Sequence, residues 1–226
     1  MAAAAKSTAV ELPPMNIQTL DIPIIGDSGL ICHAWSKKAR TAMLDKQMKK
    51  ATTGKAAKNP WQDFCETLYW LDGMPEAPTE DDVMTARFGF PAVAFKSAAI
   101  TAVTSTGGMT KVMARQCFHI VGEFVEILGP APSMREDMVR VGMGTADIRH
   151  RAEFESWGAI LRVQHNANVL SAEQVIGLFE AGGFGVGIGD WRPEKDGVNG
   201  RFHVAKTGEA LPCLLYTSPS PRDQRG

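Results

Sequence analysis

The sequence predicts an α+β fold with a ferredoxin-like core, forming a single domain over residues 15–205. This prediction rests on the order of six segments, in which strand-forming and helix-forming runs follow one another with two adjacent strands in the middle. Two insertions, 36–85 and 131–155, interrupt that order, and without them it is βαββαβ. The six segments are strand 15–25, helix 91–104, strand 118–128, strand 156–166, helix 171–181 and strand 201–205.

The first strand is predicted from the partial alternation of NIQTLDIPII, which ends at Ile25. Gly26-Asp27-Ser28-Gly29 then supplies a turn, and a second short strand is expected over 30–35.

The first insertion consists of two blocks of opposite charge. Residues 36–58 carry eight Lys or Arg against the single acid Asp45 and few apolar positions, which predicts a solvated helix or a mobile arm. Residues 60–85 carry seven acids and no Lys or Arg. Within them, one helical face is predicted from Trp61, Phe64, Leu68 and Leu71, with Tyr69 and Trp70 beside it. A further helix is expected to begin at Thr79, with acids in its first turn.

The first core helix is alanine-rich and begins near Pro91, a residue that suits the first helical turn. We expect Val93, Ile100 and Val103 to face the core, with small residues allowing close packing. Residues 110–113 extend this region after Gly107-Gly108. The second insertion is poor in apolar residues and contains His150 and four arginines, which are Arg135, Arg140, Arg149 and Arg151.

A glycine cluster follows the second core helix. Seven glycines fall within nineteen residues, 182–200. The helix before them is predicted from a Ser171–Gln174 capping box with Leu170 and Val175 as its hydrophobic staple, and Gly182-Gly183 is expected to end it. Nucleotide-binding glycine loops open a helix instead of closing one, so this order argues against a Rossmann or P-loop site. An ordinary hairpin with turns at Asp196-Gly197 and Asn199-Gly200 remains an alternative.

Composition sets broad limits on the function. The chain has 226 residues, of which 44% are hydrophobic and 22% charged, with a formal net charge of −1. Attraction to nucleic acid must therefore come from local patches. No apolar run approaches the roughly 18 residues of a membrane span, and four scattered cysteines without a CxxC pair fit reduced thiols in a cytoplasmic protein.

Both ends are expected to lie outside the fold. Residues 1–14 are small and polar, lack the pattern of a signal peptide and are predicted to be disordered. Residues 206–226 break from the preceding pattern, and LPCLLYTSPSPRDQRG resembles translated sequencing-adapter DNA. On that interpretation Cys213 is not a native residue, and the tail is excluded from the fold.

Two motifs resemble the RAMP (repeat-associated mysterious protein) superfamily. FPAVAFKSAAITAV resembles the segment that opens the first helix of these proteins, although the usual Ser-Ser or Ser-Gln pair and the Arg that follows it are missing. GVGIGDWRPEKDGVNGRF resembles their glycine-rich loop between the second helix and the last strand. The insertions lie where the backbone subunits of CRISPR effectors carry finger-like additions and a thumb. The matched residues are Lys96, Gly185, Gly187, Gly189, Arg192 and Arg201.

The resemblance implies a cytoplasmic, non-catalytic subunit that binds single-stranded RNA without a cofactor, as in the crRNA-binding backbone of a CRISPR antiviral effector. It implies a bacterial or phage source, and an oligomer or filament of like subunits. Lys and Arg would neutralise phosphates, glycines would let the backbone approach closely, and Trp191 would stack on a base or sugar. The further contact residues expected are Lys37, Lys38 and Arg40 in the first insertion and Arg140, Arg149 and Arg151 in the second.

Other interpretations stay open. The opposed charge blocks fit a phage or bacterial structural protein that self-assembles, and Lys96 fits a solvated surface residue. Asp27 fits either a turn or an RNA-cleaving carboxylate. His119 and His165 are expected to be hydrogen-bonded structural histidines without an evident partner in the sequence. Cys32-His33 with Cys117-x-His119 would be an unusual zinc site.

Overall fold

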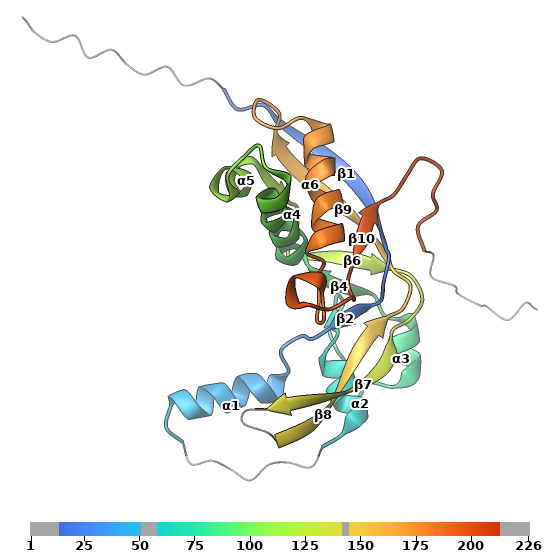
Figure 1. Ribbon diagram of the computed structural model, residues 1–226. Coiled ribbons are helices and arrows are strands. Elements are labelled where there is room, and N and C mark those ends of the chain that lie inside the picture. The colour runs from blue at the N-terminus through green and yellow to red at the C-terminus, as the bar shows by residue number, and fades with distance from the viewer. Residues whose placement is uncertain (1–13, 51–57, 142–144, 213–226) are drawn as a thin grey trace, which may run out of the picture.

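The computed structural model describes residues 14–50, 58–141 and 145–212. The chain forms a mixed α+β structure built on antiparallel sheets, which confirms the predicted class. Of the ends predicted to lie outside the fold, 1–14 and 206–226, the parts 1–13 and 213–226, including Cys213, lie outside the described residues. Residues 206–212 are described, and Glu209 among them lies 3.1 Å from His203 of β10 (Phe202–Val204). Figure 1 shows the larger sheet with its helices in the upper part of the view and a smaller sheet with α1, α2 and α3 below.

The larger sheet has seven strands within the described residues and is antiparallel at every pairing. Its centre is the long pair β1 (Ile17–Gly26) and β9 (Gly158–Asn166), and β10 (Phe202–Val204) pairs with the end of β1. On the far side of β9, β5 (Phe118–Ile120) and β6 (Phe124–Leu128) pair with opposite ends of that strand. The sheet then continues through β4 (Phe88–Pro91) and β3 (Tyr69–Trp70).

The predicted strand 118–128 is therefore interrupted. Residues 121–123 bend between β5 and β6, with Gly122 at φ +94°. The bend is still bonded on both sides, because the Val121 amide donates to the Arg162 carbonyl at 2.8 Å and the Glu123 carbonyl accepts from the Ala92 amide at 2.9 Å. The second of these bonds satisfies one of the free N–H groups at the start of α4 (Ala92–Thr106).

Two helices cover one face of the larger sheet. Helices α4 and α6 (Ala172–Gly185) lie side by side against it, with α5 (Lys111–Cys117) beyond the end of α4 (Figure 1). Strand β9 alternates accordingly, with Leu161 and Val163 buried under the helices and Ile160 and Arg162 on the other face. The Ser171–Gln174 capping box is present as predicted.

The predicted helix end at Gly182-Gly183 is wrong, because α6 continues to Gly185. These two glycines are needed for packing instead of for a turn. A Cβ on Gly182 would lie 2.8 Å from the Ala99 amide nitrogen, and one on Gly183 would lie 2.0 Å from the Phe202 carbonyl oxygen. The glycines let α6 approach both α4 and β10 closely.

Helix α4 faces the core with Ile100 and Val103 as predicted. The prediction for Val93 is wrong, because its side chain is 70% exposed in the first turn. Phe95 occupies the buried position there, in edge contact with Phe90 and Phe202.

The first insertion contains α1 (Lys37–Gln47), α2 (Pro60–Glu66) and α3 (Glu80–Thr85). The side chains of α1 from Ala39 to Gln47 are exposed apart from the partly buried Asp45, and α3 begins with a Thr79–Asp82 capping box, both in line with the sequence. The helical face predicted to reach Leu71 ends early, because the chain reverses after Glu66 into β3. The Trp70 indole N–H donates to the Cys65 carbonyl at 2.9 Å across this reversal.

The smaller sheet joins the second insertion to the chain after β1. Strands β7 (Ser133–Val141) and β8 (Thr145–Phe154) form a hairpin, and β2 (Leu30–Cys32) pairs with the end of β8. No helix in the described part of the chain is long and apolar enough to cross a membrane.

Candidate functional site

Three pockets adjoin one another and form a groove. We name them the lower, middle and upper pockets, and their volumes are about 430, 400 and 470 Å³. His33 lines both the lower and the middle pocket, and Tyr69, Pro91 and Val93 line both the middle and the upper pocket. The lining elements, α1, the linker after β2, the glycine-rich segment and the start of α4, follow one another from the bottom of Figure 1 to its centre.

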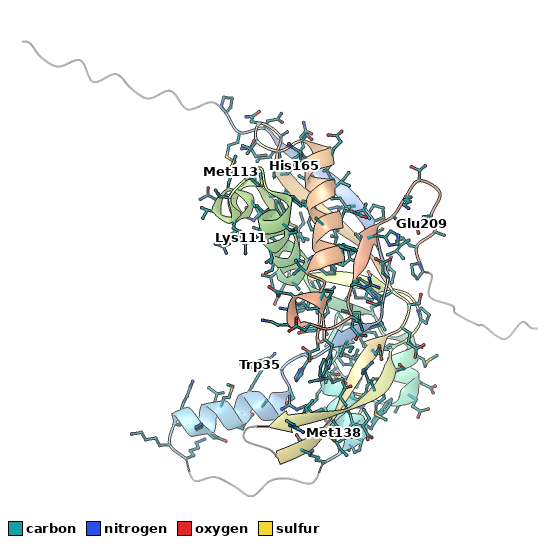
Figure 2. All side chains as sticks on the ribbon, in the orientation of Figure 1. Trp35, Lys111, Met113, Met138, His165 and Glu209 are labelled. Atoms are coloured by element: carbon teal, nitrogen blue, oxygen red, sulfur yellow. The ribbon has the colours of Figure 1, made fainter. Side chains whose placement is uncertain are left out.

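The lower pocket lies between α1, α2 and β8. Its lining includes Trp35, Met43, Lys58, Asp147 and Arg149. Trp35 is 61% exposed and extends from the linker before α1 toward the rest of the molecule (Figure 2). Lys58 forms an ion pair with Asp147 and also donates to the Ile148 carbonyl.

The glycine-rich segment after α6 forms the wall of the middle pocket. It contains a short 3₁₀ turn (Pro193–Lys195) and no assigned strand before β10. The segment nevertheless folds back on itself, because the Ile188 amide donates to the Gly200 carbonyl at 2.9 Å, so a hairpin-like loop remains an alternative description. Gly187 and Gly189 have φ +68° and +78°. A Cβ on Gly187 would lie 2.8 Å from Pro193 Cδ, and one on Gly189 would lie 2.6 Å from the Ile31 carbonyl oxygen. Both glycines are thus required by contacts within the protein.

Gly185 differs from these two glycines. It is the last residue of α6, and a Cβ added to it would meet no heavy atom within 4 Å. Its backbone is exposed, although Gly185 lines none of the three pockets.

Trp191 has a strained backbone and an exposed ring. Its φ is +55°, a left-handed value that is rare for a bulky residue, and its side chain is 47% exposed. The Asn199 amide donates to its carbonyl at 3.0 Å, and a Cβ on Gly197 would lie 1.7 Å from that same oxygen. The segment thus folds around the Trp191 backbone and leaves the indole at the surface.

Asp190 connects the glycine-rich segment to the smaller sheet. Its Oδ2 accepts from His33 Nδ1 at 2.9 Å and lies 3.4 Å from Arg151 Nη2. Arg151 is only 6% exposed and also donates to Asp137 at 3.1 Å. The His33 hydrogen bond is the main cause that lowers the pKa of Asp190, and the Arg151 charge adds to it. Arg151 is consequently a buried structural cation and not an open phosphate contact.

Arg192 is also engaged within the protein. Its guanidinium donates to the Gly189 carbonyl at 3.1 Å and to Glu194 Oε2 at 2.7 and 3.0 Å. Arg201 has a buried Nε that has no partner among the described residues, while its amide donates to the Ser28 hydroxyl at 3.0 Å.

Lys96 lies in the upper pocket. Its Nζ donates to the Arg115 carbonyl and to His119 Nδ1, each at 3.0 Å. Burial lowers its pKa. His119 therefore does have a partner, which the sequence did not reveal. His165 is buried as expected, but neither of its ring nitrogens has a hydrogen-bond partner in the described part of the chain, so the predicted hydrogen bond is absent there.

The remaining predicted contact residues lie on α1 and on the β7–β8 hairpin. Arg40 is exposed on α1 and Arg140 on the β7–β8 hairpin, while Arg149 lines the lower pocket with Asp147 3.9 Å away. Lys37 and Lys38 begin α1, and their side chains lie outside the described set.

Asp27 lines none of the three groove pockets. Its carboxylate lies 2.7 Å from His203 Nδ1, and His203 Nε2 lies 3.1 Å from Glu209. Burial alone would lower the pKa of His203, but the hydrogen bonds to the two carboxylates outweigh it and raise that pKa. Asp27 thus serves to fasten the turn after β1 to β10.

No group of three or more metal-binding side chains occurs among the described residues, and Cys32, His33, Cys117 and His119 do not form one. The described cysteines are buried and free. Burial raises the pKa values of Cys32 and Cys117, and that of Cys65 to about 11, so these thiols resist ionisation.

The groove residues that the sequence did not suggest as contacts are Trp35, Tyr69 and Phe124. Tyr69 lies 5.7 Å from Phe124 between ring centroids, although the two residues are far apart in the chain. The pairing of β3, β4 and β6 brings them together.

Comparison with known proteins gives a distant likeness of fold. The structure is similar to the crystal structure of Cmr6 from Pyrococcus furiosus, with a TM-score of 0.40 and 9% sequence identity over 85% of this chain and 100% of that chain. No protein-family profile and no curated protein sequence matches the chain. The likeness transfers neither a function nor a residue role.

Proposed function

We propose that the chain is a non-catalytic subunit that binds single-stranded RNA along the groove. The observation that carries the proposal is that neighbouring pockets share lining residues, together with the kinds of residue that line them. Trp35, Tyr69 and Phe124 offer aromatic faces, and Lys96 offers a cationic donor. Aromatic faces for bases and a cation for the backbone are the combination that single-stranded nucleic acid requires.

The strand order supports a ferredoxin-like core within the larger sheet. Reading β1, α4, β5 with β6, β9, α6 and β10 as the core elements gives βαββαβ, with the fourth, first, third and second strands side by side. In that description α1–α3 belong to the first insertion and the β7–β8 hairpin to the second. The resemblance of residues 90–103 and 185–202 to RAMP subunits fits the same arrangement, and an oligomer of like subunits is part of the proposal.

Ion pairs within the groove reduce the number of cations that can bind RNA phosphates, and so reduce the expected salt dependence of binding. Arg151 is paired with Asp137 and Asp190, and Arg192 with Glu194. Lys58 is paired with Asp147, which also lies 3.9 Å from Arg149. Lys96 and the basic helix α1 remain for phosphates. Neutralising about two or three phosphates of a single strand gives a slope of about −1.5 to −2 in log K against log salt. Stacking then supplies the rest of the affinity.

Fluorescence anisotropy with a labelled 20-nucleotide RNA tests the proposal. We expect micromolar binding that weakens with salt at this modest slope. Lys96→Gln, which removes a groove cation, is expected to weaken binding about five-fold. The matched control is Lys206→Gln, which changes a lysine that lines none of the three pockets. Lys206 lies in the loop after β10 that also carries Glu209, at the right of the view in Figure 2. Absence of salt-sensitive binding, or equal losses in both variants, would contradict the proposal.

The non-catalytic part of the proposal has a separate test. The hydrogen bond of Asp27 to His203 and its position outside the groove support a structural role. We expect no RNA fragments after long incubation with Mg²⁺ or Mn²⁺. Metal-dependent cleavage that disappears in Asp27→Ala would establish an enzyme instead.

A structural protein that self-assembles is the second candidate, favoured by apolar side chains at the end of the β7–β8 hairpin. Met138, 77% exposed, lies directly opposite Ile148, which is also exposed. Figure 2 shows Met138 at the lower end of the molecule. Light scattering without RNA separates the candidates, because ordered oligomers that RNA does not affect would favour assembly alone.

A further inference from the structure

The upper pocket is lined both by aromatic side chains and by hydrogen-bond donors. Tyr69 is half-buried and held by Phe90 in an edge contact of 5.5 Å, and Phe124 lies beside it at 38% exposure. Lys96 and His119 line the same pocket. Its volume of about 470 Å³ lies in the range of about 300–1,000 Å³ that is usual for small-molecule sites.

The hydrogen bond between Lys96 and His119 determines which N–H group each side chain has left to donate to a ligand. An ammonium group donates and cannot accept, so His119 Nδ1 must be the acceptor of the 3.0 Å bond. In the neutral ring the proton then resides on Nε2, which becomes a donor. Lys96 has three N–H groups and uses two, on Arg115 and His119, so one remains. The pocket thus presents two donors of which one is charged.

We propose that the upper pocket binds one nucleotide, with its base against Tyr69 and Phe124 and its phosphate on Lys96 and His119. The inference rests on the proposed function and deepens it, because it assigns one position on the strand where the base itself is held. A base has two flat faces that suit aromatic rings, and a phosphate has only acceptors, which suit the two donors.

Glu123 is the one acid in the described lining of this pocket. A carboxylate accepts hydrogen bonds from exocyclic amino groups, which adenine, cytosine and guanine carry and uracil lacks. The pocket is therefore expected to disfavour uracil.

The decisive experiment compares two RNAs and two proteins in a cycle. The RNAs are a 12-nucleotide poly(A) and the same sugar–phosphate chain without bases. Phe124→Ala is expected to weaken binding of poly(A) by about 5- to 150-fold, the usual range for losing one base–aromatic stack. It is expected to leave binding of the base-free chain unchanged. His119→Ala is expected to weaken both, because the phosphate is common to them.

Two control variants test whether a loss of binding comes from a loss of folding. Phe124→Trp retains an aromatic face and is expected to restore poly(A) binding, while Met84→Ala removes an exposed apolar side chain of α3 outside the groove. Poly(U) is expected to bind less tightly than poly(A), and Glu123→Gln to reduce that difference. Titration with free AMP distinguishes a site for a free nucleotide from a position on a strand.

The outcomes separate the two proposals. If the unmodified protein binds RNA but Phe124→Ala binds poly(A) equally well, the nucleotide pocket is wrong and RNA binding by the groove stands. If neither RNA nor AMP binds, both are wrong. If AMP binds and RNA does not, the pocket is a site for a free nucleotide and not a position on a strand, and the groove is not an RNA site.

Discussion

The lower half of the groove, which comprises the lower and middle pockets, differs from the upper half, which is the upper pocket, in how its charged side chains are bonded. In the lower half, Arg151 is held by Asp137 and Asp190, and Lys58 by Asp147, so charges meet inside the protein. In the upper half, Lys96 donates only to neutral acceptors, beside exposed aromatic rings. A side chain that is already neutralised stabilises structure, and one that retains charge and free donors can bind. The number of cations in a groove is therefore a poor guide to where RNA lies.

Removing the buried acid tests the lower half most strongly. Asp137→Ala leaves Arg151 without its closest anion in a buried position, and we expect a loss of about 3 kcal/mol in the free energy of unfolding, measured by urea denaturation. Its neighbour Glu136 lies on the other face of the hairpin with an exposed side chain. Glu136→Ala should therefore change stability by less than about 0.5 kcal/mol. Equal effects would mean that the ion network contributes little.

The glycine-rich segment gives a second contrast of moderate size. Gly189→Ala places a Cβ 2.6 Å from the Ile31 carbonyl at a left-handed φ, so we expect about 2 kcal/mol of destabilisation in thermal unfolding. Gly185→Ala meets no neighbour and should be neutral or slightly stabilising. If Gly185→Ala nevertheless weakens RNA binding, the backbone at that position approaches the ligand closely.

We expect low pH to reduce the stability of the protein through protonation of Asp190, which lines the middle pocket. Its pKa is lowered in the folded state, so its contribution to stability is present above the unfolded value of about 3.9 and is lost as the pH falls through the lower folded value. We expect Asp190→Asn to reduce the melting temperature at pH 6 and to have a progressively smaller effect below pH 4. A difference that stays constant with pH would assign the loss to packing.

The smallest expected change in stability belongs to the upper half. Burial lowers the pKa of Lys96, so its charge is held at some cost to stability. Lys96→Met should leave the free energy of unfolding unchanged or raise it by about 0.5 kcal/mol, while RNA affinity falls. A large loss of stability would show that Lys96 is structural and would remove the contrast between the halves.

The sequence was sufficient where local chemistry decides the structure. Ser171 with Gln174 and Thr79 with Asp82 marked helix starts that occur as predicted. It failed where tertiary contacts decide, as at Gly182, whose role is visible only when Ala99 is known to lie beside it. The glycine-rich segment was correctly placed between the second core helix and the last strand, but the hydrogen bonds within it could not be predicted from the sequence.

The site was harder to predict for the same reason. Lys96 was identified from a motif, yet Tyr69 and Phe124 join it only through the pairing of β3, β4 and β6. His33 and Asp190 are 157 residues apart in the chain. No local pattern encodes such a pair, and composition does not indicate which arginines are already bonded.

The bend at residues 121–123 has a consequence for how this protein can diversify. It interrupts a strand beside the centre of the larger sheet and supplies Gly122 and Glu123 to the upper pocket. Its fixed contacts, to Arg162 and Ala92, use backbone atoms alone. The side chains of Val121 and Glu123 can thus be exchanged with little effect on the core, whereas Gly122 is fixed by its φ of +94°. New ligand preferences can evolve at these two positions while the architecture is preserved.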